Sequence, residues 1–315
     1  MPKAITLPAT LSWGILVAAI IGMLLNGPNA VRVFQHATDT SQMSEYVPLA
    51  VVKLLAVAFI VVGFVITLKI PRNAVGWSFI GVGAGFGVFS AITDGMVLAE
   101  LPGVAHSSIW NSIVGLPDFL SLFSLVLMLI ALQLFPDGRL LDSGRIWVGV
   151  AGFTVVSGLL GAVSQGANEF AVVPFLGDLP SDYRFLHVGD TTQQVLQASV
   201  SVAALIAFLG TAASVVVRYR TGTPELREQI KWVALAAVAV VIVIAIDVAT
   251  PHHPLIDAVD GVVITFVPIA AGIAILKYRL YDVDVLISRT LVYGPLTATL
   301  AGTYTAAIVF FRLVF

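Results

Sequence analysis

The sequence contains no cysteine and few charged residues. Without cysteine the chain can form neither a disulfide nor a thiolate-ligated metal site. Charged residues make up 11% of the 315 residues, whereas about 25% is usual in a soluble domain. So few charges cannot cover a water-facing surface, and lipid must therefore be the solvent for most of the chain. The net charge of −2 gives no indication of nucleic-acid binding.

Recognisable catalytic motifs are also missing. The sequence holds no HExxH, no G-x-S-x-G, no P-loop and no aspartate-rich metal motif. No segment between the apolar runs is long enough to fold as a separate soluble domain. We therefore expect a chain without enzyme activity, without a cofactor and without a bound metal.

Apolar residues dominate the sequence and are gathered into long runs. They make up 58% of the chain, and the mean hydropathy is +1.00. A transmembrane helix needs roughly 20 mostly apolar residues. Runs of about this length lie near residues 7–25, 47–69, 75–98, 112–135, 146–164, 195–217, 232–250, 260–277 and 291–311. The runs predict an all-α fold in which residues 1–315 form one bundle of about nine transmembrane helices.

The basic residues predict how this bundle is oriented. Lys and Arg favour the cytoplasmic side of a membrane, and most of the 16 basic residues fall in cytoplasmic segments if the N-terminus is inside. The longest outer loop, near 165–194, is then acidic and contains several aromatic residues. We expect a multi-pass protein of the inner or plasma membrane with a cytoplasmic N-terminus.

Glycines recur at helical spacing in the run near 75–98. Gly81 and Gly85 are four residues apart, as are Gly83 and Gly87. Stripes of small residues let another helix approach closely in lipid. A phosphate-binding loop would instead need G-x-G-x-x-G after a strand, and this spacing does not match it. We therefore interpret the glycines as helix-packing positions.

Charged residues within the predicted helices are the candidate sensing site. Lys53, Asp94, Asp118 and Asp247 all fall in the outer third of their predicted helices. A charge inside the membrane is costly and usually faces a cavity or a partner. One hypothesis is a shared polar chamber that opens outward, in which Lys53 pairs with one or two of the aspartates. The alternative is that each side chain reaches separately to the interface.

Four segments at the cytoplasmic ends of the predicted helices resemble one family. They are PRNAVGWSFIGVG, LFPDGRLLDSGRIW, RYRTGTPELREQIKW and LKYRLYDVDVLISRTLVYG. Together they resemble the N-terminal multi-helix membrane region of bacterial sensor histidine kinases and related sensor proteins, of the actinobacterial and Chloroflexi type. The resemblance covers roughly residues 70–311.

The resemblance implies a membrane-embedded input region of a two-component signal-transduction protein. Its candidate partners are a second copy of the chain and a cytoplasmic kinase or response-regulator module. The candidate coupling residues are Arg279, Asp282, Asp284 and Arg289. The sequence contains neither a phospho-acceptor helix nor an ATP-binding domain, so we expect kinase activity only from a further domain.

Two other functions remain open from the sequence. A transporter of small molecules or ions would also contain buried charges and kinked helices, often within inverted repeats. A non-catalytic membrane scaffold would explain the glycine stripes without any ligand.

Overall fold

The computed structural model describes residues 14, 26–37, 43–99, 115–141, 145–167, 170–173, 177–180, 184–249 and 254–279. Met1–Ile275 forms one compact unit and Leu276–Phe315 another. The packing and the polar sites described below belong to the first unit.

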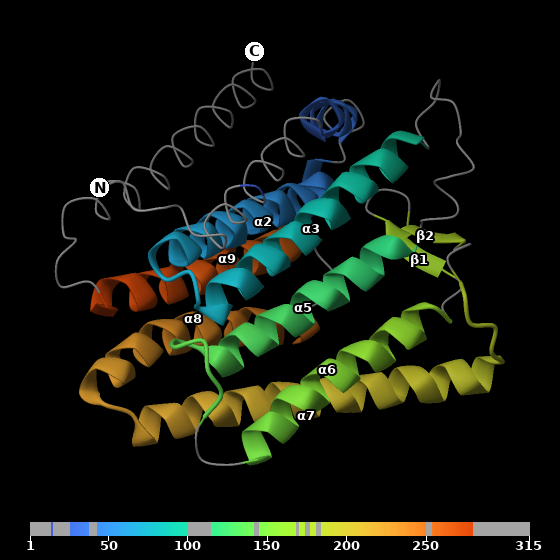
Figure 1. The fold of residues 1–315 in the computed structure, drawn as a ribbon. Helices are drawn as coiled ribbons and strands as arrows, with labels where there is room; N and C mark the ends of the chain where they lie inside the picture. Colours follow the sequence, from blue (N-terminus) through green and yellow to red (C-terminus); the bar gives the residue numbers. More distant parts are fainter. Residues whose placement is uncertain are drawn as a thin grey trace. The chain divides into compact units, whose positions relative to one another are not determined.

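Helices make up nearly all of the described structure (Figure 1). They are α2 (Met43–Lys69), α3 (Ala74–Ala99), α5 (Leu116–Leu134), α6 (Arg145–Gln165), α7 (Asp190–Thr221), α8 (Pro224–Ala249) and α9 (Pro254–Arg279). Residues 26–37 are also helical. Each predicted run between 47 and 277 therefore corresponds to a helix. The predicted helix near 291–311 and, apart from Gly14, the one near 7–25 lie outside the described residues.

Five of these helices are long and apolar enough to cross a membrane. The crossing stretches are Leu49–Lys69, Ala74–Leu98, Leu116–Leu134, Ile146–Gln165 and Asp190–Thr221, in α2, α3, α5, α6 and α7. Gly261–Leu276 in α9 is a shorter apolar stretch. The described structure is thus helical, with five helices suited to cross a membrane, as the apolar runs predict.

The segment between α6 and α7 departs from a purely helical fold. β1 (Phe170–Val173) and β2 (Gly177–Pro180) pair antiparallel, with Phe170 opposite Pro180 and Val173 opposite Gly177. The β-branched and aromatic residues of β1 suit a strand. The prediction treats this segment only as an outer loop, and it also begins α7 at 195 where the helix begins at Asp190.

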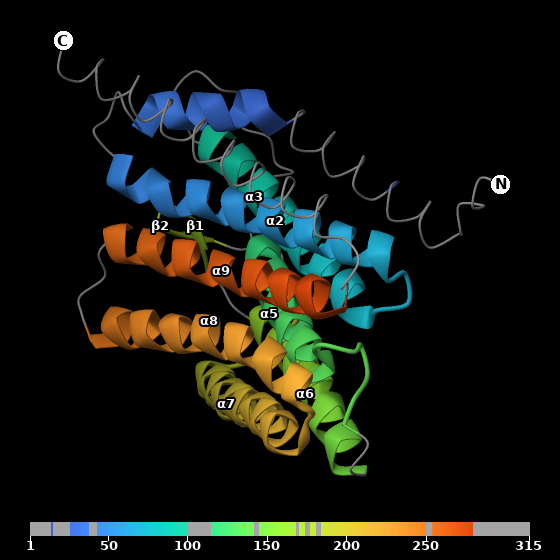
Figure 2. The ribbon, with the colours of Figure 1, turned by 90° about the vertical axis from the view of Figure 1, so that its left-hand side faces the viewer.

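Helices that follow one another in the chain pack side by side. α2 packs on α3, α3 on α5, α5 on α6 and α6 on α7. Figure 2 shows α9 between α2 and α8, and Gly272 of α9 lies against Val62 of α2. The largest core cluster includes Phe59 and Phe79, whose rings meet edge to face with centroids 5.2 Å apart.

The glycines of α3 lie on two different packing faces. A methyl group added at Gly83 would lie 2.6 Å from the carbonyl oxygen of Ala56 in α2. Gly81 and Gly85 instead face Leu127 and Ser124 of α5. Gly87 has no atom within 4 Å of where its Cβ would be. Three of the four glycines therefore permit close helix contacts, and Gly87 faces open space.

Candidate functional site

The most buried charge in the described structure is Asp94, near the end of α3. Its side chain is 0% exposed. Oδ1 accepts a hydrogen bond from Lys53 Nζ of α2 at 2.9 Å, and Oδ2 accepts one from Asn26 Nδ2 at 2.7 Å. The carboxylate is thus bonded through both oxygens, and it joins three helical segments: residues 26–37, α2 and α3.

The ammonium group of Lys53 lies at the edge of this site. Its side chain is 25% exposed, and Nζ lies 5.4 Å from the ring centroid of Tyr46. This distance is within the range of a cation–π interaction. Lys53 is therefore the partly exposed member of the ion pair, whereas the carboxylate of Asp94 is fully buried.

Tyr46 lies beside the ammonium group of Lys53, and its phenol stays neutral. Its hydroxyl donates to the carbonyl oxygen of Ala30 at 3.3 Å, and its ring meets Phe34 edge to face. Burial, together with the negative charge of Asp94, raises the pKa of Tyr46 to about 12. The phenol therefore remains a hydrogen-bond donor at physiological pH.

The ion pair lies inside the membrane-crossing stretches but close to their ends. Lys53 is four residues from Leu49, and Asp94 is four residues from Leu98. At 1.5 Å per residue, both groups lie about 6 Å inside the apolar stretch. A charge at this depth is expensive unless it is paired. The shared depth makes each residue a suitable partner for the other.

The structure brings together two of the four predicted charges. Asp94 is nine residues after Gly85, which turns it about 180° around α3 from the face that packs on α5. Asp118 belongs to the first turn of α5 and lies half-buried there. Asp94 and Asp118 are therefore on opposite sides of the α3 axis. Asp247 lies in α8, and its side chain is outside the described residues.

A second polar network, which the apolar runs and buried charges of the sequence do not predict, joins α5, α6 and α7. Gln133 Nε2 donates to Thr154 Oγ1 and to Thr211 Oγ1, each at 2.8 Å. All three side chains are at most 3% exposed. The two hydroxyls donate in turn to the carbonyl oxygens of Val150 and Ala207 in their own helices. These residues are uncharged, so nothing in the sequence separates them from other polar residues of apolar helices.

The turns after α2 and α5 are bonded directly to each other. Asn73, which is buried, donates from Nδ2 to the carbonyl oxygen of Pro136 at 2.9 Å. Its Oδ1 accepts from the backbone N–H of Val75 at 2.8 Å, as a helix N-cap does. Gly138 has φ of 73°, and a methyl group there would lie 2.7 Å from the nitrogen of Ala74. Glycine is therefore required for the contact between these turns.

Arg218 connects the end of α7 to the same region. The side chain is 6% exposed, and its guanidinium donates to the carbonyl oxygens of Gln133 and Arg139. These carbonyls belong to the last turn of α5 and the turn that follows it. Three of the segments at the ends of the predicted helices are thus bonded together. PRNAVGWSFIGVG contributes Asn73, LFPDGRLLDSGRIW contributes Pro136 and Arg139, and RYRTGTPELREQIKW contributes Arg218.

The predicted coupling residues lie at or beyond the end of α9. Arg279 is the last residue of α9, and its side chain is not described. Asp282, Asp284 and Arg289 lie outside the described residues. Among the residues that the structure describes, no group of three or more His, Asp or Glu side chains is placed to hold a metal.

No protein-family model, no curated protein and no solved structure matches this chain.

Proposed function

We propose that this chain is the membrane-embedded input region of a signal-transduction protein, with a sensing site at Asp94 and Lys53. It acts without a catalytic module of its own in this proposal, as a multi-pass protein of the plasma membrane. Its output passes to a cytoplasmic kinase or response-regulator module, and a homodimer is the expected assembly. The N-terminus and the Asn73 end of the helices face the cytoplasm.

The observation that carries this proposal is the set of bonds between the turns at Asn73, Pro136 and Arg218. A sensor must transmit a change from one side of the membrane to the other. Asp94 and Asn73 lie near opposite ends of α3. A shift of α3 at Asp94 would therefore reach the turn after α5 through Asn73, and α7 through Arg218. Such a change requires two arrangements of packed helices that a stimulus can bias.

The exposure of Lys53 supports its place in sensing. Asp94 is sealed off, whereas a quarter of the Lys53 side chain is accessible. An anionic or hydrogen-bonding stimulus can therefore approach the ammonium without first unfolding the site. If Lys53 binds that stimulus, its ion pair with Asp94 weakens, and the buried negative charge is less well balanced. A different arrangement of the helices can then become more stable than the original one.

Backbone hydrogen exchange in Asp94→Asn tests the coupling. The reporters are the amides of Asn73, Gly138 and Gly222, which donate to the carbonyl oxygens of Ile70, Leu134 and Arg218. We expect exchange at these remote amides to accelerate, because the change weakens the bond that fixes α3 against α2. The matched control is Thr93→Val, which removes only a hydroxyl bonded within α3 to Phe89.

The possible outcomes separate the proposal from its rivals. Faster exchange near Asp94 alone, with unchanged turns, would refute coupling through α3. Solute uptake by proteoliposomes that is lost in Asp94→Asn would replace the proposal with a transporter. Equal exchange in the Asp94→Asn and Thr93→Val variants would leave only a structural role for the ion pair.

A further inference from the structure

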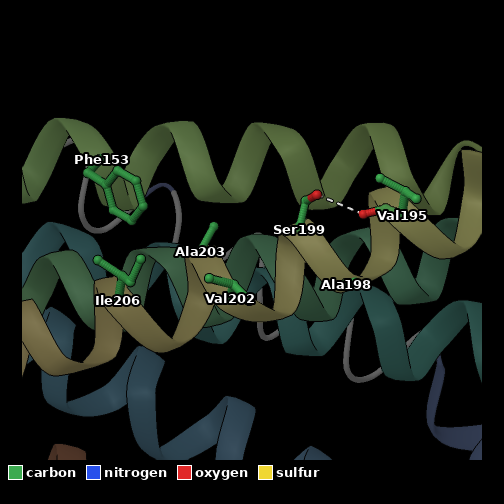
Figure 3. A pocket seen from close by; sticks show the side chains of 7 residues that line it. All are labelled: Phe153, Val195, Ala198, Ser199, Val202, Ala203 and Ile206. Atoms are coloured by element: carbon green, nitrogen blue, oxygen red, sulfur yellow. Dashed lines mark hydrogen bonds between the residues drawn. The ribbon is translucent and has the colours of Figure 1, made fainter.

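An apolar groove follows the seam between α6 and α7 (Figure 3). Its first stretch, with a volume of about 530 Å³, lies between Phe153 of α6 and residues of α7 that include Val195, Val202 and Ile206. The hydroxyl of Ser199 also lines this stretch, but it donates to the carbonyl oxygen of Val195 at 2.7 Å. The groove therefore presents hydrocarbon and a satisfied hydroxyl to its surroundings.

A second stretch of about 370 Å³ continues from Phe153 and Ile206 to Ile146, Gly149 and Gly210. Gly149 has no atom within 4 Å of where its Cβ would be, which leaves this part of the groove open. Both walls belong to membrane-crossing stretches. From Ile146 to Phe153 the groove runs about 10 Å along α6. One leaflet contributes about 15 Å of hydrocarbon, so an acyl chain matches this stretch.

The Ile146 end of the groove leads to a basic region. Gly210 lies against Val150, and Ser157 bonds to Ala203, so α6 and α7 run antiparallel. The C-terminal end of α7 therefore extends beyond Ile146. Arg220 is exposed and comes 18 residues after Val202, which is about five helical turns. It thus lies on the same face of α7 as the groove.

The charges around Arg220 favour an anion. Residues 218–231 carry four basic and two acidic side chains, and one of the acids, Glu228, is paired with Lys231. The bond from Arg218 to the carbonyl oxygen of Arg139 brings the exposed Arg139 to this end as well. Arginine binds phosphate oxygens through several N–H donors, and basic pockets between transmembrane helices bind anionic lipid headgroups.

We propose that the α6–α7 groove binds an anionic phospholipid. One acyl chain lies along the Ile146–Phe153 stretch of the groove, and the phosphate binds Arg220, with Arg139 and Arg227 adding positive charge. The apolar groove and the basic end together match the two parts of such a lipid, its hydrocarbon chain and its phosphate. The inference is independent of the proposed signalling role.

The test is lipid retention by the purified full chain, measured by native mass spectrometry with added phosphatidylglycerol or phosphatidylcholine. We expect Arg220→Gln to weaken phosphatidylglycerol binding by about fivefold, the factor for one basic residue at a charged lipid surface. Phosphatidylcholine binding should change little. Arg72→Gln is the matched control, because Arg72 is exposed in the turn before α3 and lines neither stretch of the groove.

The groove itself is tested by filling it. Gly149→Leu should reduce the retention of both lipids, whereas Gly152→Leu should leave it unchanged. The two glycines are exposed on the same helix and have open space at Cβ, but only Gly149 lines the groove. Thermal unfolding of each variant shows whether the helices still pack.

Several results would overturn the proposal. Equal effects of Gly149→Leu and Gly152→Leu on lipid retention would show that the groove does not bind the acyl chain. Equal effects of Arg220→Gln and Arg72→Gln would show that Arg220 is not a specific phosphate ligand. Displacement of the lipid by soluble glycerol phosphate at millimolar concentration would identify a phosphate site without a lipid chain. Loss of dimers in Gly149→Leu, with lipid retention unchanged, would assign the groove to a second copy of the chain.

Discussion

Removing Lys53 should destabilise the protein more than neutralising Asp94. Lys53→Met leaves a carboxylate that is 0% exposed and that, among the described residues, keeps only the amide of Asn26 as a hydrogen-bond partner. Breaking a buried pair in this way costs about 3–5 kcal/mol, and the partial exposure of Lys53 favours the lower end, about 3 kcal/mol. Asp94→Asn instead leaves a lysine that is 25% exposed and lies over the Tyr46 ring. That lysine can reach the interface, so the expected loss is about 1–2 kcal/mol.

The assay is reversible unfolding in mixed detergent micelles for wild type, the two single variants and the double variant. Because the two groups are in direct contact, the double variant should lose less than the two single losses combined, by about 1–2 kcal/mol. Lys231→Met is the matched control, since its partner Glu228 is 47% exposed. That change should cost under about 1 kcal/mol. Additive losses, or a larger loss in Asp94→Asn than in Lys53→Met, would refute the reasoning.

Three further variants have defined expectations, each measured as a change in the free energy of unfolding. Gly83→Ala should cost about 1–3 kcal/mol because its methyl group would meet the backbone of α2, whereas Gly87→Ala should cost nothing; equal effects would contradict the packing. Asn73→Ala should cost about 2–3 kcal/mol, since it removes both the helix cap and the bond to Pro136. Gln133→Leu should stay within about 1 kcal/mol, because both threonine hydroxyls keep their own acceptors and the change removes a buried Oε1 that has no hydrogen-bond partner among the described residues. A larger loss would show that the network is cooperative.

Much of this architecture follows from the sequence because lipid imposes a simple rule. A long apolar run must become a helix to satisfy its backbone, so the runs near 47–69 and 75–98 predict α2 and α3 closely. The pair of Lys53 and Asp94 is foreseeable for a similar reason, since two opposite charges at the same depth stabilise each other. Asn26 is not foreseeable, because a neutral amide carries no comparable penalty.

The contacts between turns are hidden from the sequence for a different reason. Asn73 and Pro136 are 63 residues apart. Each residue type is already common in turns, so neither one indicates a contact with a distant turn. The face on which Asp118 lies is also not fixed by hydropathy. The glycine stripes of α3 do separate the faces, however, because Gly83 meets α2 and Gly85 meets α5. Asp94 is nine residues after Gly85, a rotation of about 180° around α3, so it faces away from α5. The spacing alone therefore predicts that Asp118 of α5 lies away from the ion pair.

The absence of cysteine provides a direct test of orientation. Single cysteines at Arg72 and His187 would be the only thiols in their variants, and both residues are exposed in the structure. Arg72 lies in the turn between α2 and α3, and His187 lies just before α7. If the N-terminus is cytoplasmic, a membrane-impermeant maleimide should label His187→Cys in intact cells and Arg72→Cys only after the membrane is opened. The reverse pattern would place the turns at Asn73, Pro136 and Arg218 outside the cell, where they could not contact a cytoplasmic kinase or response regulator, and the proposed signalling direction would fail.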